Sequence, residues 1–264
     1  MCMRSYIILL LTLMIINISC AGAERVRSIL PRNSFLKMEK SLLLTVCNPK
    51  NPNQCLERLY GATASGVVIE NTDSGSYALT AAHVCSDKRL EVIKRKVTRY
   101  KMSFNVLDID AEKFSAEVIA SDPIHDVCII FIKGLQRPPI RLAATKPKPG
   151  DRVYNVAAPI GIFGKQMVPI FEGFYNGEAH NRALFSLPVK GGSSGSPITN
   201  RHGELVGMVS AAFVHFGHLA ISPTYEALTS FIKTIVAADK LNRPKLTILS
   251  KLMVLNRLKN KKKP

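Results

Sequence analysis

The stretch Gly192-Ser193-Ser194-Gly195-Ser196-Pro197 decides how this chain is interpreted. Glycines flank two adjacent serines, and a glycine lets the backbone adopt a positive φ and approach other groups closely. A turn of this kind can aim successive backbone N–H groups at one point, which an oxyanion requires. One of the serines is therefore a candidate nucleophile, provided that a histidine and an aspartate precede it in suitable surroundings.

Both partners precede the serines. His83 ends the stretch Leu79-Thr80-Ala81-Ala82-His83, and Asp126 leads into the apolar run of residues 127–132. An aspartate at the mouth of a buried strand can orient an imidazole. The order His, Asp, Ser is that of one known type of catalytic triad. We expect Ser194 to be the nucleophile, His83 the general base and then acid, and Asp126 the group that fixes the His83 tautomer.

These residues resemble those of the trypsin-like serine proteases of the chymotrypsin fold, and the bacterial Deg/HtrA branch more than digestive trypsin. Residues 65–83, 125–127 and 192–209 carry the resemblance, which covers roughly residues 41 to 238. It implies an all-β protein of two six-stranded antiparallel β-barrels with a C-terminal helix. It also implies that the N–H groups of Gly192 and Ser194 hold the oxyanion. Because Ser193 replaces the aspartate of trypsin-like zymogens, activation by N-terminal cleavage is not expected.

The same resemblance implies a pocket for the side chain that precedes the scissile bond. Its base would lie at Pro188, Val189 and Lys190, and its wall at Ser210, Ala211 and Ala212. No aspartate occurs at this base, so we expect small or medium apolar side chains there rather than Arg or Lys. His215 and His218 either tune this pocket toward acidic side chains or are loop and strand-edge histidines.

His125 adjoins Asp126 and is a competing candidate for the triad histidine. Neighbours in a strand point to opposite faces, so His125 and Asp126 cannot both point inward, and we expect His125 at the surface. No Cys/His cluster has zinc-ligand spacing, and we expect neither a metal nor a cofactor.

Short apolar runs between turn signals predict the strands of the two barrels. They are Leu42–Val46, Gly66–Ile69, Met102–Val106, Glu117–Ala120, Val127–Ile132, Val153–Ala157, Met167–Phe171, Leu184–Leu187, Leu205–Val209 and Leu219–Ser222. The helix is expected to begin with Ser222 as N-cap and to bury Leu228, Phe231, Ile232, Ile235 and Val236 on one face.

These predictions divide the 264 residues into seven parts. They are a signal peptide (1–23), an N-terminal segment (24–40), the first barrel (41–136), a proline-rich linker (137–150), the second barrel (151–222), the helix (223–239) and a basic tail (240–264). Too little chain follows the helix for a PDZ domain, so none is expected.

The N-terminus indicates export. Arg4 precedes an apolar core, and Ala21-Gly22-Ala23 supplies a signal-peptidase site. Cys20 opens the alternative of a lipoprotein anchor. We expect a periplasmic or secreted protein.

Four cysteines follow the signal segment, which allows three pairings in an oxidising compartment. We favour Cys47–Cys55, which would close a turn-rich loop, and Cys85–Cys128, because each follows a triad residue by two positions. Buried free thiols are the alternative for Cys85 and Cys128.

The chain carries a formal net charge of +17, and residues 240–264 contain no acid. This tail is either a solvated end or a basic amphipathic helix that contacts an anionic membrane or another polyanion. Export makes nucleic acid a less natural partner. The expected activity is that of a serine endopeptidase acting on proteins or peptides. The alternative is a catalytically idle protease fold that serves as a binding or adhesion module anchored by its basic tail.

Overall fold

The structure is a computed structural model that describes residues 30–48, 50–86, 98–213 and 216–243. The expected signal peptide, Cys20, His215 and residues 244–264 of the basic tail lie outside these ranges. None of the helices within them is both long and apolar enough to span a membrane.

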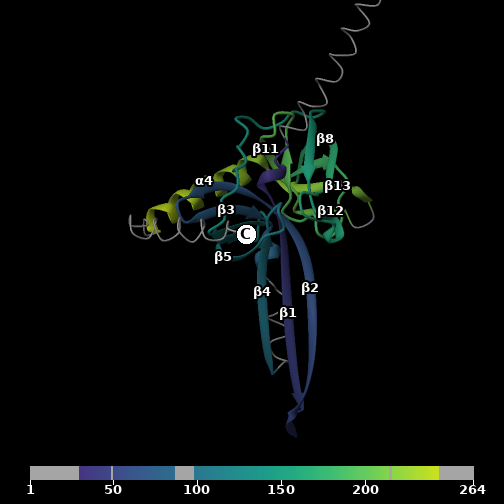
Figure 1. Cartoon of the computed structure of the whole chain (residues 1–264). Coiled ribbons are helices and arrows are strands. Elements are labelled where there is room, and N and C mark those ends of the chain that lie inside the picture. The colour runs from purple at the N-terminus through teal and green to yellow at the C-terminus, as the bar shows by residue number, and fades with distance from the viewer. Residues whose placement is uncertain (1–29, 49, 87–97, 214–215, 244–264) are drawn as a thin grey trace, which may run out of the picture.

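The first lobe is a closed antiparallel barrel of six strands (Figure 1). Around the barrel the order is β1 (Phe35–Asn48), β2 (Asn51–Thr72), β3 (Gly75–Thr80), β6 (Val127–Lys133), β5 (Lys113–Asp122) and β4 (Arg99–Leu107). All six residues of β3 are buried, as are the first six of β6. An apolar run such as residues 127–132 is typical of a strand covered on both faces, and here it marks the centre of the core.

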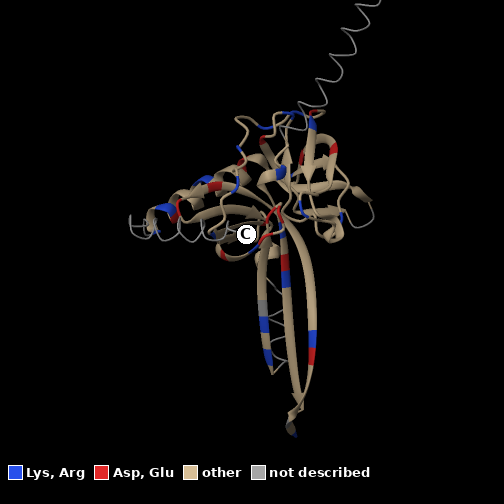
Figure 2. Ribbon diagram, viewed as in Figure 1, with Lys and Arg blue, Asp and Glu red and all other residues tan. Residues whose placement is uncertain are grey.

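Strands β1, β2 and β4 continue past the barrel as a long projection, which we call the arm (Figure 1). The predicted runs 42–46 and 102–106 lie within β1 and β4. The predicted loop between Cys47 and Cys55 is mostly strand, because β1 reaches Asn48 and β2 begins at Asn51. Cys47 and Cys55 face each other across the two strands and form a disulfide. Figure 2 shows that both basic and acidic side chains occur along the arm.

The second lobe differs from the expected closed six-stranded barrel. It is a single sheet of seven strands in the order β11 (Leu205–Met208), β10 (Pro197–Thr199), β7 (Arg152–Val156), β8 (Ile170–Ala179), β9 (Arg182–Ser186), β13 (Phe216–Pro223) and β12 (Ala211–Phe213). The edge strands β11 and β12 are separated in the chain by Val209 and Ser210 alone. Two residues span only about 10 Å, so the sheet curls until its edges approach each other without pairing. The all-β, two-lobed class is confirmed, and the connection between the lobes is residues 134–151.

The C-terminal helix α4 (Tyr225–Asn242) follows the second lobe in sequence but packs on the core of the first barrel through Leu228, Ile232 and Val236. Its N-cap is Thr224, whose side chain accepts a hydrogen bond from the Ala227 N–H. The expected cap, Ser222, is buried at the end of β13, where its hydroxyl accepts the Met208 N–H at 3.0 Å.

The far end of α4 is fastened to the barrel by polar contacts. The Tyr77 hydroxyl donates to Asp239 at 2.6 Å, and burial together with this carboxylate raises the pKa of Tyr77 to about 12. Lys240 lies 2.7 Å from Glu70, and the Arg243 guanidinium stacks 3.7 Å from the Phe131 ring centre. The first residues of the expected basic tail therefore belong to the helix and its anchor.

Candidate active site

His83 lies on a short helix at the end of a buried strand. β3 ends at Thr80, Ala81 is extended, and α2 (Ala82–Cys85) begins at the next residue. A disulfide joins Cys85, the last residue of α2, to Cys128 at the start of β6, so the end of α2 is held against the barrel. The His83 side chain is about half exposed, at 52%, which leaves the imidazole accessible to solvent.

Asp126 occupies a turn immediately before β6 and has a positive φ of 59°. Aspartate tolerates the left-handed region better than most residues. Its carboxylate oxygens lie 3.0 and 3.1 Å from the His83 Nδ1, and one of them accepts the His83 backbone N–H at 3.0 Å. The second oxygen accepts the Ser210 hydroxyl at 2.6 Å.

Burial by itself would raise the pKa of the Asp126 carboxyl. The hydrogen bonds from the His83 ring, the Ser210 hydroxyl and the His83 N–H outweigh burial and hold that pKa below its ordinary value. Asp126 is therefore an anion at neutral pH. An ionised carboxylate beside Nδ1 favours the tautomer in which Nδ1 carries the proton and Nε2 is a free base.

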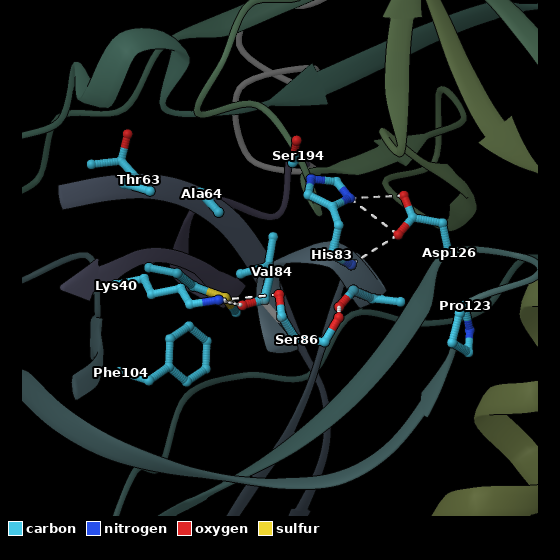
Figure 3. Close-up of a pocket in the computed structure, with 13 residues that line it drawn as sticks. Lys40, Thr63, Ala64, His83, Val84, Ser86, Phe104, Pro123, Asp126 and Ser194 are labelled. Atoms are coloured by element: carbon cyan, nitrogen blue, oxygen red, sulfur yellow. Dashed lines mark hydrogen bonds and ion pairs between the residues drawn. The ribbon is translucent and has the colours of Figure 1, made fainter. Parts of the chain in front are cut away.

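Ser194 lies beside the imidazole edge opposite to Asp126 (Figure 3). His83, Asp126 and Ser194 line one cavity of about 330 Å³. Within the described residues no hydrogen bond joins Ser194 to His83. In a site without substrate this bond is often long and tightens only when substrate binds.

The turn around Ser194 requires its glycines. Gly192 has φ 100° and Gly195 has φ 85°. A Cβ at Gly192 would lie 2.4 Å from the Ala158 carbonyl oxygen, and one at Gly195 would lie 2.2 Å from the Ser65 carbonyl oxygen. Both the backbone conformation and the close approach therefore exclude a side chain.

Ser65, on β2, ties this turn to the first barrel. Its N–H donates to the Ser194 carbonyl and its hydroxyl to the Gly192 carbonyl, each at 2.8 Å. Ser65 is fully buried. In the sequence, Ser65 is only the first residue of the stretch 65–83 that carries the family resemblance. Its contacts with the Ser194 turn could not be predicted, because they join residues far apart in the chain.

His125 is not part of this cluster. Its Nδ1 lies 2.6 Å from Asp122, and Arg182 donates to its backbone carbonyl. The alternation of side chains expected for a strand does not apply to His125 and Asp126, because residues 123–126 form a turn. The His125 side chain is nevertheless 40% exposed, so it lies at the surface as expected, paired with Asp122.

A second cavity of about 260 Å³ is lined by Ser194 but not by His83 or Asp126. Four of the expected pocket residues line it, namely Val189, Lys190, Ala211 and Ala212, together with Gly191, Val209, Phe213 and Gly217. Three do not: Pro188, Ser210, which bonds to Asp126, and His218, which is exposed and contacts the Phe216 ring. Strand pairing between β12 and β13 brings Phe213 and Gly217 to the cavity. No local sequence motif predicts that these two residues line it.

The chain is similar to known peptidases. The family model described as "Trypsin-like peptidase domain" matches residues 64–208. A "Probable periplasmic serine endoprotease DegP-like" of Pseudomonas putida (strain W619) is 26% identical over 180 residues, which are 64% of this chain and 33% of that protein. The chain thus spans about a third of the length of the curated relatives it matches.

Two solved structures have the same fold. The serine endoprotease from Yersinia pestis is 18% identical, with a TM-score of 0.58 over 82% of this chain and 66% of that one. A protease from M. tuberculosis in its active form is 19% identical, with a TM-score of 0.55 over 78% of this chain and 82% of that one.

Proposed function

Because the chain belongs to the trypsin-like peptidase family, we propose that it is an exported serine endopeptidase that works through Ser194, His83 and Asp126. The Asp126–His83 pair carries the proposal. Its Nδ1–Oδ2 distance is 3.0 Å, and the other edge of the same ring faces Ser194 (Figure 3). This is the arrangement that general-base activation of a hydroxyl needs.

The reaction proceeds in two halves. The Ser194 Oγ attacks the peptide carbonyl carbon while the His83 Nε2 takes its proton, and the carbonyl oxygen becomes an oxyanion held by the Gly192 and Ser194 N–H groups. His83 then gives the proton to the leaving amine as the C–N bond breaks, which leaves an acyl-enzyme. Water, deprotonated by His83, hydrolyses the ester and restores Ser194. Asp126 stays ionised throughout and stabilises the imidazolium.

The second cavity, which Ser194 lines and His83 does not, is the proposed site for the side chain before the scissile bond. Apart from Lys190, its lining is apolar or small: Val189, Gly191, Val209, Ala211, Ala212, Phe213 and Gly217. No carboxylate is among these residues, so nothing there pairs with a substrate Arg or Lys. We expect Ala, Val or Leu at this substrate position, selected by size.

Export is supported by the expected signal segment and by the two disulfides, which persist in oxidising compartments. The similar proteins from Pseudomonas putida are described as periplasmic. N-terminal sequencing of the cell-derived protein tests this proposal, since export by this route predicts a mature terminus at or near Glu24, or at Cys20 for a lipoprotein.

Hydrolysis of fluorogenic peptides tests the activity. We expect cleavage after Val or Leu to exceed cleavage after Arg at least tenfold in kcat/KM. His83→Ala should lower kcat by about 10⁴-fold or more. His125→Ala is the matched control and should retain the wild-type rate. Equal loss in the two variants would contradict the assignment of His83.

A further inference from the structure

A hydrogen bond joins two tight turns next to Ser194. In residues 158–161 the Gly161 N–H donates to the Ala158 carbonyl at 3.0 Å. Pro159 is second in this turn, and Ile160 is third with φ 47° and ψ 24°. A positive φ at the third position is characteristic of a type II turn and favours Gly or Asn. A β-branched residue there is an outlier.

Residues 190–193 form the second turn. The Ser193 N–H donates to the Lys190 carbonyl at 2.9 Å, and the third residue, Gly192, has φ 100°. With glycine at both central positions, little in the turn itself prevents its central peptide from turning over to the type I form. That change would reverse the direction of the Gly192 N–H.

One hydrogen bond couples the two central peptides. The Ile160 N–H donates to the Gly191 carbonyl at 2.6 Å. The Gly191–Gly192 peptide is trans, so its N–H points opposite to its carbonyl and hence away from Ile160. Gly191 and Ser194 both line the cavity beside the nucleophile. Holding the Gly191 carbonyl therefore fixes the direction of the Gly192 N–H.

The Ile160 side chain does not account for the strain in its backbone. It is 74% exposed, so burial of the side chain does not compensate for the left-handed conformation. Relaxing Ile160 to a negative φ would convert the 158–161 turn to type I and turn its N–H away from Gly191. Persistent strain of this kind is found where the surroundings impose it, often at functional sites.

We propose that Ile160 is a positioning residue whose backbone N–H holds the Gly191–Gly192 peptide in the orientation that presents the Gly192 N–H to the oxyanion. The inference rests on the proposed function, because it assigns a role in that reaction. The strained 158–161 turn and the oxyanion-binding turn are then two coupled elements, and the donor at residue 160 selects the active arrangement of both.

Replacing the Ile160 amide by an ester, through incorporation of the α-hydroxy acid of isoleucine, removes the N–H and keeps the side chain. We expect kcat for a peptide substrate to fall about 100-fold, as for loss of one oxyanion donor, with KM changed less than twofold and the melting temperature nearly unchanged. Ile160→Pro also removes the donor and should lower kcat at least as much.

Ile160→Asn is the matched control, because asparagine keeps the N–H and tolerates the left-handed region. It should retain or exceed the wild-type kcat. An ester variant with full kcat, or an Ile160→Asn variant as impaired as the ester, overturns the inference alone. A wild-type protein that neither hydrolyses peptides nor reacts with a fluorophosphonate overturns the proposed function and this inference with it.

Discussion

Three hydrogen bonds hold the Asp126 carboxylate, although the sequence suggests only the one to the His83 ring. The turn before β6 presents its carboxylate to the His83 ring, the His83 N–H and the Ser210 hydroxyl. Each bond favours the ionised form, and together they outweigh burial. A carboxylate in this setting orients the imidazole and also contributes to stability while it is charged.

Ser210→Ala tests this balance through the pH dependence of stability. A carboxyl whose pKa is lowered on folding stabilises the protein above the ordinary aspartate pKa of about 3.9, and that stability is lost as the pH falls through the native pKa. We expect Ser210→Ala to be about 1.5 kcal/mol less stable at pH 7, with the difference from wild type shrinking below pH 4.

Urea unfolding from pH 3 to 7 measures this difference. Ser103→Ala removes the hydrogen bond between the Ser103 and Ser41 hydroxyls on β4 and β1, which does not involve Asp126, and serves as control. A deficit in Ser210→Ala that stays constant down to pH 3 would disprove the link to Asp126.

The glycines of the Ser194 turn are not equivalent to other glycines with positive φ. Gly195→Ala combines φ 85° with a contact of 2.2 Å to the Ser65 carbonyl, whereas Gly134 has φ 79° and open space around it. We expect Gly195→Ala to lose more than about 3 kcal/mol of stability and all activity. Gly134→Ala should cost about 1–2 kcal/mol and keep its kcat. Equal losses of stability in thermal unfolding would show that the positive φ alone, and not the close contact with Ser65, determines the cost of the substitution.

At this scale the sequence points to the proposed catalytic residues more readily than to the residues that contact them. His83, Asp126 and Ser194 stand in local motifs whose order is informative. Ser65, Ser210 and Ile160 make their contacts with backbone or side chains far away in sequence, and serine or isoleucine at such positions has many ordinary uses. Their roles follow only from the fold.

Among the elements, α2 is tied directly to the barrel strand β6 by a disulfide. The Cys85–Cys128 bond closes a separation of 43 residues and holds the helix that carries His83, whereas Cys47–Cys55 closes a separation of 8 on the arm. The sequence favours both pairs, the first because each cysteine follows a triad residue and the second because the two flank a turn.

Removing each disulfide should therefore have different consequences. Cys85→Ala/Cys128→Ala should lose about 4 kcal/mol of stability and most of kcat, because α2 is released. Cys47→Ala/Cys55→Ala should lose about 2.5 kcal/mol with kcat unchanged. Denaturant unfolding and steady-state kinetics measure both quantities. An unchanged kcat in the first double variant would show that α2 holds His83 without the bond.

The strands of the barrel were predictable where burial makes them continuously apolar, as in residues 127–132. In the arm, the runs 42–46 and 102–106 of β1 and β4 are predicted, but the extension of β2 through residues 51–65 is not, because these residues lack a clear alternation. The helix was expected from its apolar face, and its start was misplaced by two residues because Ser222 and Thr224 are both acceptable caps. Ser222 still belongs to β13, which ends at Pro223, so Thr224 is the residue that caps the helix.

For the whole molecule, the two lobes are joined by more than the connecting segment. Ser65 of the first barrel binds the Ser194 turn, and α4 returns from the second lobe to the first core. The proposed triad residues come from both lobes, so we expect their alignment to depend on these contacts. The sequence predicts two lobes from the spacing of its strands, but it does not distinguish a closed barrel from a sheet curled short of closure.

The central claim is that Ser194, activated by His83, is the nucleophile of this molecule. A fluorophosphonate probe followed by intact mass measurement and peptide mapping tests it most directly. We predict one adduct per chain, located on Ser194, retained in Ser193→Ala and absent from Ser194→Ala and His83→Ala. A folded wild-type protein without an adduct, or an adduct on Ser193, would contradict the account.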